Sequence, residues 1–357
     1  MNKRLASLDA LRGFDMFFIT GGAGFIAALA TLGGGDGGWL AAQMGHVAWA
    51  GFHHHDTIFP LFLFLAGVSW PFSLASQREK GKSDGRIHLK ILCRTAALFA
   101  LGMTFGGVLK FNPHFRIPSV LGFIGIAWGL SALIFMHVGN LWKRFAVITG
   151  LVLGYFALLH FGGDYTLEGN VIRFLDLKLM PNHLYVPGNY DPESLLSVPG
   201  GMIIALLGMM SGALLRSEKL AAAKKALMLF GAAAVSLVLA LIFIYALNVP
   251  MVKALWTVSF DFAALTYSFA MLALFYTVVD ILGFKRWTVL FDPIGKNSIL
   301  VYMCSGIGVW RAISGFFFSG LAGVCGDWKN VVSNLAYYLT ALAIAWYFRE
   351  KRVFLKV

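Results

Sequence analysis

The stretch from Gly45 to Ser69 reads GHVAWAGFHHHDTIFPLFLFLAGVS, and its character changes sharply at Asp56. Before Asp56 it is rich in histidine, whereas after it an apolar run continues to about residue 76. Asp56 suits the cap of a helix, because its carboxylate can accept from the free amides of the first turn. Pro60 is tolerated there because its missing N–H has no partner to lose. An apolar helix of about 20 residues can cross a bilayer. The stretch therefore predicts a membrane-spanning helix with a histidine-bearing loop at its start.

The composition of the whole chain extends this prediction to a bundle. Of 357 residues, 59% are apolar and only 13% are charged, whereas a soluble domain has roughly 25% charged residues. The apolar stretches also show no alternation with a period of two, which argues against a barrel. We expect an all-α polytopic membrane protein in which residues 1–357 form a single transmembrane domain. The ten expected spans cover residues 8–31, 57–76, 91–109, 118–138, 145–162, 196–215, 226–247, 259–281, 293–313 and 331–348.

The basic residues between these spans predict the orientation. One set of alternate segments contains 20 Lys and Arg residues, and the opposite set contains 7. The larger set is Lys3, Arg4, Arg78, Lys80, Lys82, Arg86, Lys90, Arg94, Lys143, Arg144, Arg216, Lys219, Lys224, Lys225, Lys285, Arg286, Arg349, Lys351, Arg352 and Lys356. The smaller set is Lys110, Arg116, Arg173, Lys178, Lys253, Arg311 and Lys329. Because cytoplasmic loops are enriched in Lys and Arg, we expect both termini in the cytoplasm. The net charge of +12 therefore orients helices and does not indicate nucleic-acid binding.

The histidines before the second span are the first candidates for chemistry. His46 precedes Asp56 by ten residues, and an imidazole exchanges protons near neutral pH. His53, His54 and His55 raise the possibility of zinc or copper. Three consecutive histidines diverge on regular backbone, so we expect a solvated turn and no metal.

Several ionisable groups are expected near the ends of spans, where a polar cavity could reach them. Arg12 lies at the inward end of the first span, where it pairs with Asp9 or meets an anionic ligand. Lys296 and Asn297 lie near the inward start of the ninth span, and Asp261 lies near the outward start of the eighth. Wetted helix ends explain each of these residues equally well.

Six segments together resemble a known family. The segments are RLASLDALRG (Arg4–Gly13), the spaced set His46, Trp49, Gly51, Asp56, Phe59, Pro60 and Gly67, RIPSVL (Arg116–Leu121), YDPESL (Tyr190–Leu195), PMVKALWTVS (Pro250–Ser259) and GKNSILVY (Gly295–Tyr302). They are similar, in order, to blocks of the transmembrane acetyltransferases typified by heparan-alpha-glucosaminide N-acetyltransferase and of their bacterial relatives. His46 matches the histidine that is catalytic in that family. Two positions differ: Thr20 occupies the region of a common asparagine, and Gly122 with Phe123 replaces a common Gln-Arg pair.

The resemblance implies that an acetyl group passes across a membrane from cytoplasmic acetyl-CoA to the amine of a glucosamine-type sugar. It implies catalytic roles for His46, as the general base, and for Asp56, as the group that orients it. Implied sugar contacts are Trp49, Asp191, Glu193, Lys253 and Trp256, and implied contacts to acetyl-CoA are Arg12, Arg116, Lys296 and Asn297. The expected location is a bacterial-type inner membrane.

Two other classes of function compete with this expectation. A transporter for amino sugars or N-acetylglucosamine would explain the ten spans and the polar groups at depth, but it needs no acetyl donor. A protein that only assembles with an enzyme complex leaves the histidine motif unexplained. The expected partners are acetyl-CoA, the amino-sugar acceptor and the lipid bilayer. A homodimer is included because many such bundles dimerise.

Overall fold

The computed structural model describes residues 5–111 and 113–355, and within these ranges every regular element is helical. The basic residues Lys3, Arg4 and Lys356, which contributed to the predicted orientation, lie outside the described residues. The principal helices are α1 (Ala6–Phe17), α2 (Ala23–Ala30), α3 (Gly38–Gln43), α4 (Ile58–Glu79), α5 (Asp84–Phe105), α6 (Val120–His137), α7 (Leu141–Phe161), α8 (Val171–Leu179), α9 (Val198–Arg216), α10 (Ala222–Leu241), α11 (Val258–Phe275), α12 (Asp292–Lys296), α13 (Ser298–Gly306), α14 (Val309–Val324) and α15 (Lys329–Glu350).

Nine helical segments within the described part of the chain are long and apolar enough to cross a membrane. Each corresponds to one of the expected spans, with ends that differ by up to seven residues. The first, Ala6–Ala30, joins α1 to α2 through a wide turn at Phe18–Gly22. The all-α membrane architecture predicted from composition is therefore confirmed.

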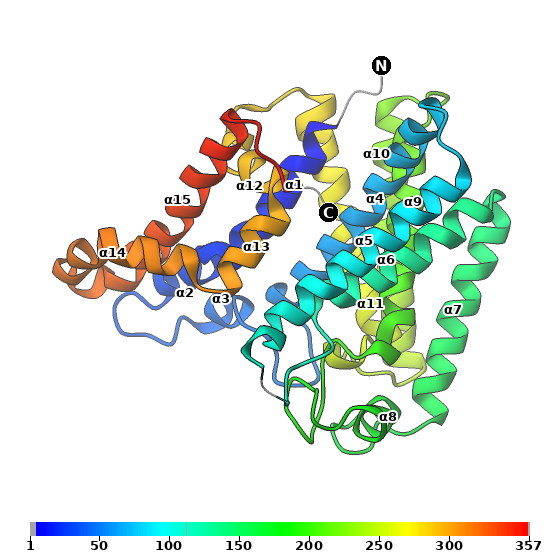
Figure 1. Cartoon of the computed structure of the whole chain (residues 1–357), viewed down its shortest axis with the longest axis horizontal. Coiled ribbons are helices and arrows are strands. Elements are labelled where there is room, and N and C mark those ends of the chain that lie inside the picture. The colour runs from blue at the N-terminus through cyan, green and yellow to red at the C-terminus, as the bar shows by residue number, and fades with distance from the viewer. Residues whose placement is uncertain (1–4, 112, 356–357) are drawn as a thin grey trace.

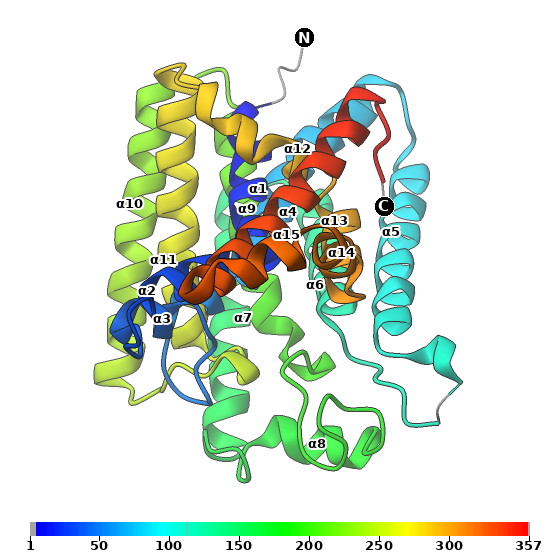
Figure 2. The same ribbon diagram turned by 90° about the vertical axis from the view of Figure 1, so that its left-hand side faces the viewer.

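The expected ninth span, residues 293–313, is not one continuous helix. The segment divides into α12, α13 and the start of α14, and α13 and α14 meet at an angle of 71°. Gly308 lies at the bend with a φ of +79°, which suits glycine because it has no Cβ. Figure 2 shows α14 nearly end-on, crossing the direction of the long helices.

The ends of the bundle differ in their elements (Figure 1). The α4–α5 turn and the end of α15 lie at one end, which we call the terminal end, and α8 lies at the other, the α8 end. The expected inward loops thus gather at the terminal end, and the expected outward segment that contains α8 lies at the opposite end, whereas the α14–α15 junction lies between the two ends (Figures 1 and 2).

Glycines allow the central helices to approach closely. A Cβ on Gly67 of α4 would lie 2.4 Å from the carbonyl oxygen of Ala205, and one on Gly208 of α9 would lie 2.3 Å from that of Phe64. Small residues at such crossings let membrane helices pack backbone against backbone. Gly13 of α1 and Gly295 of α12 make a similar contact, so the first and last of the six matched segments meet in space.

Candidate active site

The loop between α3 and α4 places His46 and Asp56 together at the α8 end. Asp56 lies in a short 3-10 turn, His54–Thr57, which leads into α4. Its Oδ2 atom accepts from the backbone N–H of His53 at 3.1 Å and faces that of Val47 at 3.5 Å. The carboxylate therefore closes the loop by accepting from free amides, as expected of a group at a helix start.

The other oxygen of Asp56 faces the imidazole. Nδ1 of His46 lies 2.7 Å from Oδ1 of Asp56, and Nζ of Lys253 lies 3.3 Å from the same oxygen and 3.1 Å from Nδ1. Nδ1 cannot both donate to Asp56 and accept from Lys253, and the shorter contact is the one to Asp56. Because a carboxylate only accepts, Nδ1 carries the proton and Nε2 is left with a free lone pair. The Asp56 side chain is 1% exposed and that of His46 is 54% exposed, so a buried carboxylate holds a solvent-accessible imidazole ring.

A second loop brings Lys253 to this pair. Ala50 and Val252 form an antiparallel bridge, in which the N–H of Gly51 donates to the carbonyl of Met251 at 2.8 Å. Thr257 supports the loop from within, because its hydroxyl donates to the carbonyl of Pro250 at 2.9 Å. Burial lowers the pKa of Lys253, while the charges of Asp56 and Glu193 oppose that change. The ammonium group of Lys253 therefore lies near the carboxylates of Asp56 and Glu193 and is largely shielded from solvent.

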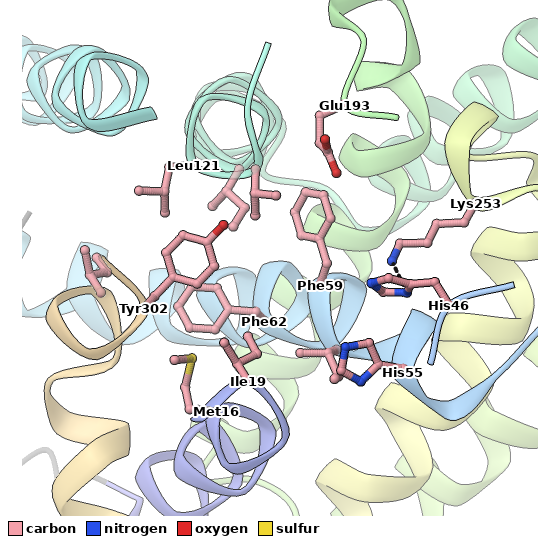
Figure 3. A pocket seen from close by; sticks show the side chains of 14 residues that line it. Met16, Ile19, His46, His55, Phe59, Phe62, Leu121, Glu193, Lys253 and Tyr302 are labelled. Atoms are coloured by element: carbon pink, nitrogen blue, oxygen red, sulfur yellow. Dashed lines mark hydrogen bonds between the residues drawn. The ribbon is translucent and has the colours of Figure 1, made fainter. Parts of the chain in front are cut away.

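These groups lie at one end of a cavity of about 230 Å³ (Figure 3). His46, His55, Lys253 and Glu193 contribute ionisable groups to its wall. The remaining wall is mostly apolar and includes Met16, Phe59, Phe62, Leu121, Ile124 and Ile299. Tyr302 lies away from His46 in the view, beside Leu121. A narrow apolar chamber with a few polar groups at one end is typical of small-molecule sites.

Arg116 holds the acidic residues of this region. It makes a two-pronged hydrogen bond to Asp191, with distances of 2.7 and 2.5 Å, and it also contacts Glu193. Burial alone would lower the pKa of Arg116, but the hydrogen bonds and charges of Asp191 and Glu193 outweigh it and raise the pKa. Burial also raises the pKa of Glu193, against the opposing effect of Arg116. Of the two acids, only Glu193 lines the cavity.

The two tryptophans predicted to contact the sugar lie elsewhere. Trp49 is half-buried, and its Nε1–H donates to the carbonyl of Tyr165 at 2.8 Å. Trp256 is fully buried, and its ring stacks on Phe123 with 4.5 Å between centroids. Neither is part of the cavity wall. The structure therefore gives both rings a packing role and brings neither to the chamber.

The predicted contacts to acetyl-CoA do not gather at one place. Arg12 of α1 reaches α4, where it contacts Ser69 and the carbonyl of Leu65. Lys296 pairs with Asp292 at 2.6 Å. Asn297 is buried and bonds to backbone atoms of Val353 and Leu355. These three residues lie in or beside α1 and α12, whereas Arg116 belongs to the acidic cluster described above.

Sequence reasoning missed the apolar wall of the chamber, two of its polar residues and one of the contacts at its polar end. His55 and Tyr302 line the wall, and Lys253 meets His46 although 207 positions separate them. Tyr302 could have been found, because it ends one of the six matched segments. The three neighbouring histidines diverge as expected: His53 contacts the carbonyl of Gly45, His54 contacts Tyr267, and His55 faces the cavity. Among the described residues, no group of three or more His, Cys, Asp or Glu side chains is arranged to hold a metal ion.

Comparison with known proteins agrees with the resemblance seen in the sequence. No family model matches the chain. The chain is 27% identical to human heparan-alpha-glucosaminide N-acetyltransferase over 84% of its own length and 52% of that protein. It is 26% identical to the mouse protein of the same name over 99% of its own length and 61% of that protein. The chain thus spans about half to three-fifths of the length of these curated relatives.

Proposed function

Because this chain is a relative of the heparan-alpha-glucosaminide N-acetyltransferases over most of its length, we propose that it is a membrane-embedded acetyltransferase. It moves the acetyl group of acetyl-CoA to the amine of a glucosamine-type sugar. The observation that carries the proposal is the pairing of His46 with the buried Asp56 at the polar end of an apolar chamber. A base held by a buried carboxylate is a recurring arrangement in enzymes that transfer acyl groups.

The reaction needs a base because the nitrogen of a neutral amine becomes positively charged as it bonds to the carbonyl carbon, and it must then lose a proton. Nε2 of His46 takes a proton from the attacking amine as the new C–N bond forms. The tetrahedral intermediate then collapses, the C–S bond breaks, and the proton returns from His46 to the sulfur of the leaving CoA. Asp56 keeps Nδ1 protonated and balances the positive charge that His46 carries between the two steps. Each proton is accounted for without a further reactant.

The apolar wall suits the thioester arm of the donor. Met16, Phe62, Leu121 and Ile299 offer contacts to a chain with few charges, and they exclude water that would otherwise hydrolyse the thioester. At the other end, Lys253 is placed to stabilise negative charge that develops on the carbonyl oxygen. This position differs from the sugar contact expected of Lys253, because its nearest partners are His46 and Asp56.

Glu193 is the acceptor contact that the chamber supports best. Among the described residues it is the one acidic residue in the cavity wall, and Arg116 fixes its position. A carboxylate there can accept from sugar hydroxyls or attract an ammonium group. Both carboxylate oxygens of Asp191 accept hydrogen bonds from Arg116. We therefore assign Asp191 and Arg116 the role of holding Glu193 in position.

The proposed sidedness follows from the basic loops. The terminal end carries most of the lysines and arginines, so we place it in the cytoplasm, where acetyl-CoA is made. His46 then faces the periplasm of a bacterial-type inner membrane. Arg12, Lys296 and Asn297 lie toward the donor's side. Their partners within the protein, Ser69, Asp292 and the backbone near Val353, support structural roles at least as well.

Purified protein in detergent tests the function directly. We expect labelled acetyl-CoA and glucosamine to give N-acetylated product without any vesicle. Acetyl-CoA should also raise the melting temperature, because a ligand at about a hundred times its Kd stabilises the folded state by about 2.7 kcal/mol. Uptake of amino sugar into proteoliposomes, with no product in detergent and no stabilisation by acetyl-CoA, would identify a transporter.

A further inference from the structure

A second cavity lies at the terminal end of the bundle, away from His46. Its volume is about 520 Å³, against about 230 Å³ for the chamber at His46. It is lined by the terminal-end portions of α4, α6, α7 and α9. We call it the arginine cavity, after Arg78, Arg144 and Arg216 in its wall.

The helix α4 separates the two cavities. Phe62 faces the chamber at His46, and Pro71, nine residues later, faces the arginine cavity. Nine residues make two and a half turns of an α-helix, so the two side chains lie on opposite faces. The arginine cavity is therefore a separate site and not a continuation of the chamber.

The rim of the arginine cavity is positively charged and weakly neutralised. In the part of the chain that the structure describes, Glu79 is the one acidic residue of this wall, against three arginines. Arg216 lies 4.0 Å from Glu79 and Arg78 lies 3.9 Å from Asp84, and all four side chains are largely exposed. Exposed pairs at such distances contribute little. Both arginines can therefore turn to a bound anion.

Arg144 differs from the other two because it is anchored. Its Nε–H donates to the carbonyl of Val138 at 2.6 Å, and a terminal nitrogen donates to that of Phe135 at 3.0 Å. These bonds satisfy carbonyls at the end of α6, and the guanidinium lies 3.7 Å from the centre of the Phe135 ring. It supplies a fixed positive charge at the edge of the cavity.

The floor of the arginine cavity is apolar. Pro71, Leu74 and Ala75 of α4 form it together with Phe135, Met136 and Ala213. Aromatic residues on α7 indicate where the site lies along the membrane normal: Trp142 is 78% exposed and Phe145 is 42% exposed. Exposed tryptophan is enriched where a membrane meets water. The exposed Trp142 therefore supports a position of the arginines near headgroup level, with the apolar floor toward the hydrocarbon.

We propose that the arginine cavity binds an anionic phospholipid. The phosphate would contact Arg78 and Arg216, and the glycerol and the start of an acyl chain would contact the apolar floor. Basic pockets between membrane helices recognise lipid headgroups of this kind. A free phosphate would use the rim alone, whereas the floor fits a ligand that is both charged and apolar.

Lipid binding to the full-length protein tests this proposal. Native mass spectrometry and thermal unfolding would compare phosphatidylglycerol with phosphatidylcholine in the same detergent. We expect phosphatidylglycerol to bind preferentially and to stabilise the wild type. The double variant R78Q/R216Q should bind it roughly ten-fold or more weakly, because each cation near the phosphate contributes. The matched control K285Q/R286Q removes the same charge from an exposed segment at the same end, and it should keep the preference.

A second variant tests the apolar floor with all three arginines kept. Ala213→Phe should also weaken binding of phosphatidylglycerol, while melting in phosphatidylcholine confirms that the variant is folded. Equal binding in R78Q/R216Q and the control would overturn the proposal. Wild-type binding in Ala213→Phe would reduce the site to a charged surface and overturn it as well. Equal stabilisation by inorganic phosphate, or displacement of the lipid by acetyl-CoA, would assign the cavity to a soluble anion instead.

Discussion

Asp56 connects the folding of a loop with the chemistry of a side chain. One of its oxygens accepts from backbone amides of the loop, and the other faces His46 and Lys253. Removing the carboxylate would therefore loosen the loop and leave the imidazole without its partner. The contacts of His46 are made by its imidazole ring and do not hold the loop backbone. A substitution at His46 therefore tests catalysis with less disturbance of the loop.

His46→Ala should lower turnover roughly 10²- to 10⁴-fold, the usual share of general-base catalysis, while acetyl-CoA binding stays near the wild-type value. Direct transfer is expected because a thioester is already activated and both substrates can meet at one histidine. Steady-state kinetics and thermal shift measure the two quantities.

His53→Ala is the matched control, since the ring of His53 contacts the carbonyl of Gly45 and does not line the chamber, and it should cost far less activity. Rapid quench with labelled acetyl-CoA and no acceptor decides the route. Stoichiometric label on His46, formed and discharged at catalytic rates, would replace direct transfer with a covalent intermediate. Loss of donor binding in His46→Ala would make the residue a structural one.

Asp176 of α8 offers a test of stability against pH. Burial raises its pKa from 3.8 to about 6, although the hydroxyl of Ser194 donates to it at 2.8 Å. A raised pKa in the folded state means that ionisation opposes folding, so the contribution of Asp176 is most favourable below about pH 4 and declines as the pH rises to about 6. Asp176→Asn should thus gain stability relative to the wild type over this interval and keep that gain above it. Since one pKa unit corresponds to about 1.36 kcal/mol, the gain is at most about 3 kcal/mol.

Melting temperatures of both proteins from pH 4 to pH 8 measure this difference. Because the two proteins share all other titrating groups, the difference between their curves isolates Asp176. A constant difference across the range would show that Asp176 ionises in the folded protein as readily as in water.

Among the elements, the contact between α4 and α9 depends on glycine. Gly208→Ala would place a methyl carbon 2.3 Å from the carbonyl oxygen of Phe64, so the two helices must separate. Overpacking of this kind typically costs about 1–3 kcal/mol. Thermal unfolding should therefore show a clear loss of stability.

Gly154→Ala provides the comparison within the same protein. Gly154 lies inside α7, and an added Cβ there would meet nothing within 4 Å. Alanine favours a helix over glycine by roughly 0.5–1 kcal/mol, so this variant should be as stable as the wild type or slightly more so. An equal loss of stability in the two variants would show that close packing between helices is not the reason for glycine at position 208.

The elements also show how far the sequence predicts the fold. Nine spans could be found because each is a long apolar run, and the order of such runs is local information. The bend at Gly308 could not be found in this way, since an apolar run continues through it. Whether a glycine adopts a positive φ cannot be read from the sequence and is known only from the folded backbone.

At the scale of the whole molecule, the orientation in the membrane is open to a direct test. Gly81 lies in the α4–α5 turn and Asn170 lies at the start of α8, at opposite ends of the bundle (Figure 1). Reporters fused after these residues should give opposite signals, with the Gly81 fusion cytoplasmic because of the basic loops. A third fusion, after Ser217 between α9 and α10, should report the same side as Gly81. Signals from one side at Gly81 and Asn170 would contradict this topology.

The candidate site shows the same limit over longer distances. His46 and Asp56 could be paired because they lie ten residues apart at one helix start, and the structure places them in contact. Lys253 could not be assigned to that pair, because only the folded chain brings the two loops together. Trp256 resembled a sugar platform for a similar reason: a sequence does not reveal whether an aromatic ring near a helix end is buried.

The bridge between Ala50 and Val252 has a consequence for anyone who builds hybrids from this protein and a relative. It makes the segment that carries His46 and the segment that carries Lys253 a single transplantable module, although they are far apart in the gene. If only one segment were replaced, the bridge would join a segment from one parent to a segment from the other. The ammonium group of Lys253 would then shift relative to the imidazole of His46. Recombination libraries should therefore place crossovers so that both segments come from the same parent, and the surviving clones should be those in which they do.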